Sequence, residues 1–105
     1  MSLYMLKILL PEKKVYEAEI SALTVLCENG LLTVLANHEP MIATIGEGPL
    51  VIKTAQETLE GTAGAGLLKV SRDDVVVMVH SFKWGGEETE EEALVEEENE
   101  DDLLL

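Results

Sequence analysis

The sequence predicts an all-β fold, a small β-sandwich or flattened barrel of about eight to ten short strands, followed by an acidic tail. Short apolar runs rich in β-branched side chains recur between Leu3 and Phe82. Residues that favour turns separate these runs at regular intervals. No long helical period occurs before residue 86. Regular strands and turns of this kind favour a sandwich or a flattened barrel.

The apolar runs themselves are the predicted strands. In YEAEI, residues 16–20, three apolar side chains alternate with two glutamates, as expected of a strand with one face against a core. In VVVMVHS, residues 75–81, both faces are largely apolar, which predicts a central strand. The predicted strands are Leu3–Leu10, Val15–Ile20, Leu23–Cys27, Leu31–Ala36, Leu50–Ala55, Thr58–Gly61, Gly66–Val70 and Val75–Ser81.

Turn residues lie between these strands. The predicted turns are residues 11–13, 28–30, 46–49 and 71–74, which contain Gly, Pro, Asn or Asp. The glycines of GTAGAG, residues 61–66, do not have the GxGxxG spacing, and no helix follows them. A tight turn or bulge between strands explains them better than a phosphate-binding loop.

The chain divides into a β domain, residues 1–86, and an acidic tail, residues 87–105. The net charge is −14, yet residues 1–86 carry all seven basic residues and ten of the acidic ones, a net charge of −3. The tail holds the other eleven acidic residues and no Lys or Arg. Repulsion between these carboxylates favours a disordered tail, although Thr89 and Glu92 fit the capping box of a short helix.

Composition excludes several classes of function. No cluster of Lys and Arg is present, so nucleic-acid binding is not expected. No run of about 20 apolar residues could span a membrane. The single Cys27 cannot form an internal disulfide, which fits a reducing compartment.

Candidate catalytic and metal-binding groups are sparse. His38 and His80 are the only imidazoles, and no GxSxG motif occurs. Cys27 has Leu26 and Glu28 as neighbours, so we expect it to pack in the core rather than act as a nucleophile. One Cys and two distant His are too few for a zinc site. We therefore expect no catalytic residue, cofactor or metal, and Trp84 either seals the edge of the core or anchors a partner.

Three segments in order carry a resemblance to a known family. They are LKILLPEKKVYEAEISALTV, GLLTVLANHEPMIATIGEGPLVI and AGAGLLKVSRDDVVVMVHSF. Together they resemble the amino-terminal β-sandwich domain of the epsilon subunit of F-type ATP synthases over about residues 3–84. The family pattern is kept at Gly30, His38, Pro40, Gly48 and Pro49, and Thr33 and Ala36 depart from it.

The resemblance implies a non-catalytic rotor subunit of the central stalk that couples the membrane ion-translocating ring to the gamma subunit. It places the subunit at the cytoplasmic face of the inner or plasma membrane, attached only through the complex. The segment from Glu28 to Pro40 would face the ring, with contacts from Glu28, Asn37, His38, Glu39 and Pro40. Nothing after Gly86 resembles the family's helical pair, so ATP binding and helix-mediated inhibition are not implied.

Two other functions fit the residues. A free-standing β-sandwich adaptor could bind a basic partner through the acidic tail, independently of any stalk protein. A small-ligand or metal-binding domain could use His38, Glu39 and His80, and its melting temperature would then rise with ligand concentration.

Overall fold

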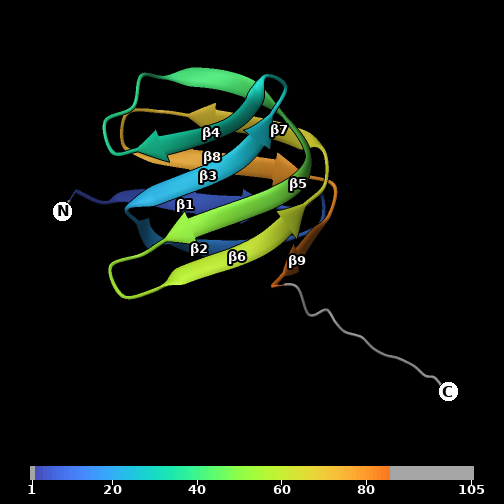
Figure 1. Ribbon diagram of the computed structural model, residues 1–105, viewed down its shortest axis with the longest axis horizontal. Coiled ribbons are helices and arrows are strands. Elements are labelled where there is room, and N and C mark those ends of the chain that lie inside the picture. The colour runs from blue at the N-terminus through green and yellow to red at the C-terminus, as the bar shows by residue number, and fades with distance from the viewer. Residues whose placement is uncertain (1, 86–105) are drawn as a thin grey trace, which may run out of the picture.

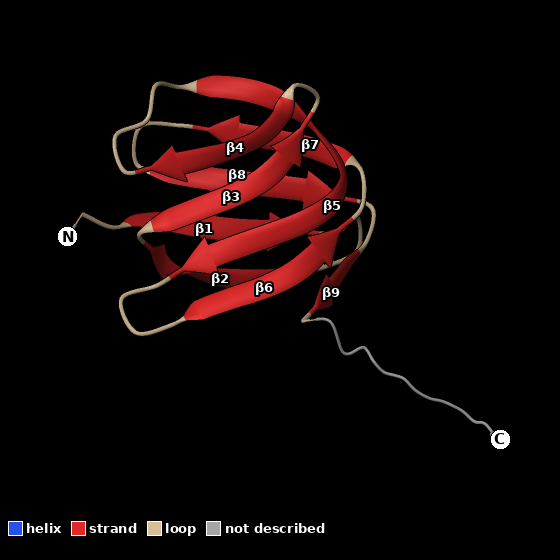
Figure 2. Ribbon diagram, in the orientation of Figure 1, coloured by secondary structure: helices blue, strands red, loops and turns tan. Residues whose placement is uncertain are grey.

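The computed structural model describes residues 2–85, which form nine strands and no helix (Figures 1 and 2). This confirms the predicted all-β class. The acidic tail, the capping box at Thr89 and the proposed domain boundary lie outside the described residues. The strands are β1 (Tyr4–Leu9), β2 (Lys14–Ile20), β3 (Ala22–Cys27), β4 (Gly30–Leu35), β5 (Met41–Lys53), β6 (Thr58–Ala63), β7 (Gly66–Val70), β8 (Asp74–Val79) and β9 (Phe82–Trp84).

The strands pack as two layers that share β5. The pairing order is β2-β1-β8-β7-β5-β3-β4, and β6 pairs with β5 and with β9. All of these pairs are antiparallel except β1 with β8. Within residues 2–85 the sheet does not close, because β4 pairs only with β3. The strand β4 is therefore an edge strand (Figure 1).

The long strand β5 corrects one sequence prediction. The segment 46–49 was predicted to be a turn, and it lies inside β5 instead. Before it, residues 41–45 pair with β7 in one layer, and after it, residues 48–53 pair with β6 in the other. A Cβ on Gly48 would lie 2.7 Å from Cδ2 of Leu26, so the strand packs closely against β3 at this point. The strand passes between layers at its glycines without breaking.

The buried core confirms the predicted alternation. In β2 the glutamates are exposed, whereas Ile20 is fully buried. In β8 the side chains of Val75, Val77 and Val79 are buried, and the strand is central because it pairs with both β1 and β7. The side chains with no exposed surface at all are Leu6, Ile8, Ile20, Leu23, Val25, Val34, Leu50, Ile52, Leu68 and Val77.

A buried tyrosine joins the two layers at one end. The hydroxyl of Tyr4, in β1, donates to the carbonyl oxygen of Val34, in β4, at 2.5 Å. Burial raises the pKa of Tyr4, and a backbone hydrogen bond with Leu23 lowers it by a smaller amount. The resulting pKa is about 12. The phenol is therefore neutral at physiological pH and acts as a hydrogen-bond donor.

Aromatic side chains cover the edge opposite to β4. The ring of Trp84, in β9, lies 5.3 Å from the ring of Tyr16, in β2, and 4.7 Å from that of Phe82, both edge to face. The strand β9, which the sequence did not predict, thus bridges β6 to the edge of β2. Of the two roles expected for Trp84, sealing the edge of the core agrees with these contacts.

Candidate partner-binding site

The five residues predicted to contact a partner lie in two different turns. Glu28 is in the two-residue turn between β3 and β4, and Asn37–Pro40 are in the connection between β4 and β5. The whole of β4 separates them, and six strand residues span about 20 Å. The structure therefore brings Asn37, His38, Glu39 and Pro40 together and places Glu28 at the other end of the sandwich.

The turn that holds Glu28 is a tight hairpin. Cys27 pairs with Gly30 across it, and Gly30 has a φ of 116°, which favours glycine. Glu28, Asn29 and Gly30 are all exposed. Pairing on both sides of a two-residue turn fixes the backbone of Glu28 to the framework of β3 and β4.

The connection at the other end is longer and polar. Asn37 has a φ of 67°, a conformation that asparagine tolerates better than most residues. The backbone N–H of His38 donates to the carbonyl of Leu35 at 3.2 Å, and its Nδ1 lies 2.9 Å from the carbonyl oxygen of Glu39. With the β7–β8 turn, the loop borders a hollow of about 400 Å³, lined by Asn37, His38, Glu39, Pro40, Arg72 and Asp73.

An apolar face, which the sequence did not single out, lies on the outside of β1, β8 and β7. The cross-strand register places Met78 opposite both Leu9 and Leu67. Leu67 is 45% exposed and Met78 is 38% exposed. We call Leu9, Leu67 and Met78 the apolar row. The signal for it was the VVVMVHS strand, whose second face carries Val76 and Met78 in place of charged residues.

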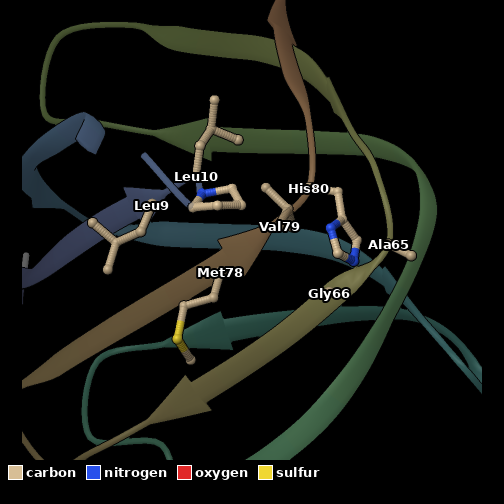
Figure 3. A pocket seen from close by; sticks show the side chains of 8 residues that line it. Leu9, Leu10, Ala65, Gly66, Met78, Val79 and His80 are labelled. Carbon is tan, nitrogen blue, oxygen red and sulfur yellow. The ribbon is translucent and has the colours of Figure 1, made fainter. Parts of the chain in front are cut away.

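The apolar row continues into a hollow at the end where β1 and β8 finish (Figure 3). Its volume is about 310 Å³, and its lining is Leu9, Leu10, Pro11, Ala65, Gly66, Met78, Val79 and His80. The backbone N–H of His80 donates to the carbonyl of Ala65 at 3.2 Å, which anchors the rim. Most of the lining is apolar, and the imidazole of His80 is part of it.

The candidate metal ligands named from the sequence do not come together in the described part of the chain. Between residues 2 and 85 no three His, Cys, Asp or Glu side chains converge on a common point. His38 and Glu39 border the polar hollow beside Asp73, whereas His80 follows β8 at its far end, so six strand residues separate the two histidines. These three residues cannot bind one ion, which removes the metal site considered from the sequence.

Cys27 packs against the core, as predicted. Burial raises the pKa of its thiol, which lowers the fraction of reactive thiolate at neutral pH. Residues 2–85 contain no helix of the length and apolarity that crossing a membrane requires.

Comparison with known proteins identifies the family. The family described as "ATP synthase, Delta/Epsilon chain, beta-sandwich domain" matches residues 3–85. An ATP synthase epsilon chain of Caldicellulosiruptor saccharolyticus is 29% identical over 98 residues, which are 93% of this chain and 72% of the relative. The epsilon chain of Micrococcus luteus is 31% identical over 75 residues, covering 70% of this chain and 82% of the relative.

Solved structures share the fold. A chain of the Euglena gracilis mitochondrial ATP synthase (OSCP/F1/c-ring) has a TM-score of 0.79 at 17% identity, covering 86% of this chain and 57% of that one. A chain of the Tetrahymena thermophila mitochondrial ATP synthase (central stalk/c-ring) has a TM-score of 0.65 at 18% identity, covering 75% of this chain and 64% of that one. This chain thus spans less than two thirds of either structural neighbour. Because the family match extends over residues 3–85, the chain belongs to the ATP synthase delta/epsilon family and contains its β-sandwich domain.

Proposed function

We propose that this chain is a non-catalytic rotor subunit in the central stalk of an F-type ATP synthase, where it couples the membrane ring to the gamma subunit. The family match over residues 3–85 is the observation that carries the proposal. The structural neighbours belong to assemblies whose names include the c-ring, and one of these names also includes the central stalk, which supports the same location. Attachment to the membrane would come only through the complex.

The apolar row is the proposed contact with gamma. Leu9, Leu67 and Met78 are contiguous across three strands and lead into the apolar hollow. An apolar centre with a polar rim is the usual anatomy of a protein interface. Here Lys7 and Lys69 lie one row further along the same face, since both oppose Val76. The face therefore offers an apolar anchor next to two ammonium groups.

The ring contact predicted for the whole Glu28–Pro40 segment must be divided, because its two turns lie at opposite ends of the sandwich. We assign the ring contact to the hairpin at Glu28. A two-residue turn held by β3 and β4 transmits force with little deformation, because close-packed strands yield little. Asn37, His38, Glu39 and Pro40 would then face away from the ring, toward the rest of the stalk.

A capture experiment tests this function. The full chain and residues 1–86 are each presented to the gamma subunit and the rotor ring of the source organism. We expect both forms to capture gamma, because the proposed contact lies within residues 2–85. A failure of both forms to bind gamma, with capture of some other basic partner by the full chain alone, would favour the tail-dependent adaptor.

Matched variants locate the contact. Leu67→Glu combined with Met78→Glu places two carboxylates on the apolar row, and we expect gamma capture to be lost. Leu35→Glu, at an exposed position on β4 away from this row, is the control and should retain capture. Equal losses in the two variants would contradict the assignment of the gamma contact to this face.

A further inference from the structure

The free edge of β4 lacks the usual protection of an edge strand. Residues 30–35, GLLTVL, contain no charged residue and no proline. Within residues 2–85 this strand pairs on one side only, with β3. Leu31 is 65% exposed and Leu35 is 57% exposed. An uncharged, apolar edge with unpaired backbone groups is a template for another strand.

The strand β2, at the other end of the pairing order, is an edge strand that is protected against pairing with another chain. The strand β2 carries Lys14, Glu17 and Glu19, and the ammonium group of Lys14 is bonded to the carboxylate of Glu17. Its Tyr16 is covered by Trp84. Charges and a covering strand both prevent edge-to-edge pairing. Because the same small domain protects β2 and leaves β4 open, the open edge is available for an intermolecular strand.

A hollow of about 430 Å³ lies beside this edge. It extends from the β3–β4 hairpin to the first part of β5, and its lining is Cys27, Glu28, Asn29, Gly30, Leu31, Leu32, Met41, Ile42, Ala43 and Thr44. In this part of β5 only Ile45 pairs with β3, so residues 41–44 have a second free edge among residues 2–85. Ile42 is 69% exposed there. A strand added to β4 would cover apolar surface as well as pair its backbone.

The charges around β4 favour one kind of strand as its pairing partner. Glu28 follows one end of the β3–β4 pair and Glu39 lies beyond the other end of β4, and both are exposed. A strand with basic residues at its ends would bring positive charge toward these carboxylates, of which Glu39 shares its hollow with Arg72 and Asp73. The acidic tail is excluded by its eleven acidic residues, and the chain leaves the described part after β9, at the far end of that layer from β4. A second copy paired through β4 would bring the same acidic flanks against each other.

We propose that the free edge of β4 binds an extended segment of another protein by strand addition, and that this segment has an uncharged, β-branched centre with Lys or Arg at both ends. Main-chain hydrogen bonds to β4 would supply affinity, and alternate side chains would contact the hollow and the exposed leucines. This inference does not depend on the stalk function, because neither gamma nor the ring enters its test.

The test uses the full chain and the peptide acetyl-Lys-Val-Thr-Val-Thr-Val-Lys-amide. Hydrogen exchange of the backbone amides of residues 31–35 is followed by NMR. Exchange of the amides that face the free edge, which alternate along β4 with those bonded to β3, should slow about tenfold when the peptide is present at ten times its Kd. The amides of β2 that face away from β1, and so exchange without unfolding, should be unaffected. Modification of Cys27 by a thiol reagent should also slow, since this thiol lines the hollow.

Two controls isolate the edge and its charges. A peptide with Glu in place of both Lys should bind at least tenfold more weakly at low salt. Leu31→Lys combined with Leu35→Lys should abolish slowing of exchange by the lysine peptide, whereas Leu67→Lys should not. All three positions are exposed, so the urea midpoints should match that of the unsubstituted chain.

Three results would overturn the proposal. The first is unchanged exchange and unchanged Cys27 modification at millimolar peptide. The second is equal binding of the lysine and glutamate peptides. The third is slow exchange in β4 without peptide that increases with protein concentration and accompanies a dimer in sedimentation, which would assign the edge to a second copy.

Discussion

The turns at the two ends of β4 are both polar and were assigned to one partner-facing segment in the sequence, yet the fold holds them differently. The turn at Glu28 has two residues, and strand pairing begins immediately on both sides, at Cys27 and Gly30. The connection through His38 has five residues and is held by a backbone bond to Leu35 and by its own side chain. The comparison shows that similar composition does not imply similar rigidity, because rigidity comes from the strands at either side.

The surroundings of the two turns differ as well. The hairpin end also contains the turn at Gly64 and the apolar hollow, where strands approach closely. The opposite end contains Tyr4, whose hydroxyl joins the two layers, and the polar hollow with Arg72 and Asp73. One end is fixed by close backbone packing, and the other is fixed by a hydrogen bond. Substitutions that disturb the close backbone packing and substitutions that remove the hydrogen bond should therefore change the stability by different amounts.

The largest effect is expected from Gly66→Ala at the hairpin end. A Cβ on Gly66 would lie 1.9 Å from the backbone oxygen of Met78, which cannot move without disturbing the β7–β8 pairing. We expect a loss of about 3 kcal/mol or more in the free energy of unfolding, measured with urea. Gly46→Ala is the matched control, because its Cβ would meet Leu26 at 3.9 Å, an ordinary contact. Similar costs for both substitutions would show that close approach is not what holds this end.

A direct comparison of the turns uses Gly30→Ala and Asn37→Ala. Gly30 has a φ of 116° with nothing within 4 Å of a new Cβ, so the cost is backbone strain alone, about 2 kcal/mol. Asn37 has a φ of 67°, nearer the left-handed region that side chains tolerate, and about 1 kcal/mol is expected. Urea unfolding measures both free-energy losses. A larger loss for Asn37→Ala would contradict the conclusion that the turn at Glu28 is the more rigid of the two.

Tyr4→Phe tests the hydrogen bond that joins the layers at the polar end. Removing the hydroxyl leaves the carbonyl of Val34 without this buried donor, and about 1–2 kcal/mol of stability should be lost at pH 8. Because folding raises the pKa of Tyr4 from 10 to about 12, its contribution is complete below pH 10 and is lost as the pH rises through 12. The difference between the unsubstituted chain and the variant should therefore shrink between pH 10 and pH 12. A difference that stays constant over this range would mean that Tyr4 does not titrate as a buried phenol.

The smallest effect on stability is expected from His38→Ala combined with Glu39→Ala. Both side chains are at the polar surface, and the bond of His38 Nδ1 is to the neighbouring carbonyl only, so the unfolding free energy should change by no more than about 0.5 kcal/mol. A loss of several kcal/mol would show that His38 holds the loop in place. Glu28→Ala, at the other turn, should be equally neutral for folding and serves as the control.

Much of the fold could be predicted because alternation reports burial directly. The alternation in YEAEI predicts which side chains face the core, and the apolar faces of VVVMVHS predict a central strand. Both predictions were confirmed. The course of β5 through Gly46 and Gly48 was predicted wrongly, because glycine and proline usually end a strand and only the partners β7 and β6 show that this one continues. The strand β9 has three residues and is defined by its contacts with β6 and β2. Local sequence holds no comparable signal for it.

The candidate surfaces were only partly visible in the sequence. The polar residues at both turns were identified, but their assignment to one surface ignored the predicted strand between them, whose six residues already separate Glu28 from Asn37 by about 20 Å. The apolar row needed the register of β1, β7 and β8, because Leu9, Leu67 and Met78 come from distant parts of the chain. Contacts between distant segments depend on pairing, which a single sequence does not display.

Cross-linking from the two turns tests the proposed arrangement most directly. In the assembled enzyme of the source organism, Cys27 is replaced by Ser, and Glu28→Cys or Asn37→Cys is introduced into that background. A short cross-linker with a thiol-reactive end and a photoreactive end should then join the Glu28→Cys variant to the rotor ring and leave the Asn37→Cys variant uncoupled to it. Coupling of the Asn37→Cys variant to the ring, with none from the Glu28→Cys variant, would contradict the proposed orientation. If neither variant were coupled to the ring or to gamma, the stalk function itself would be contradicted.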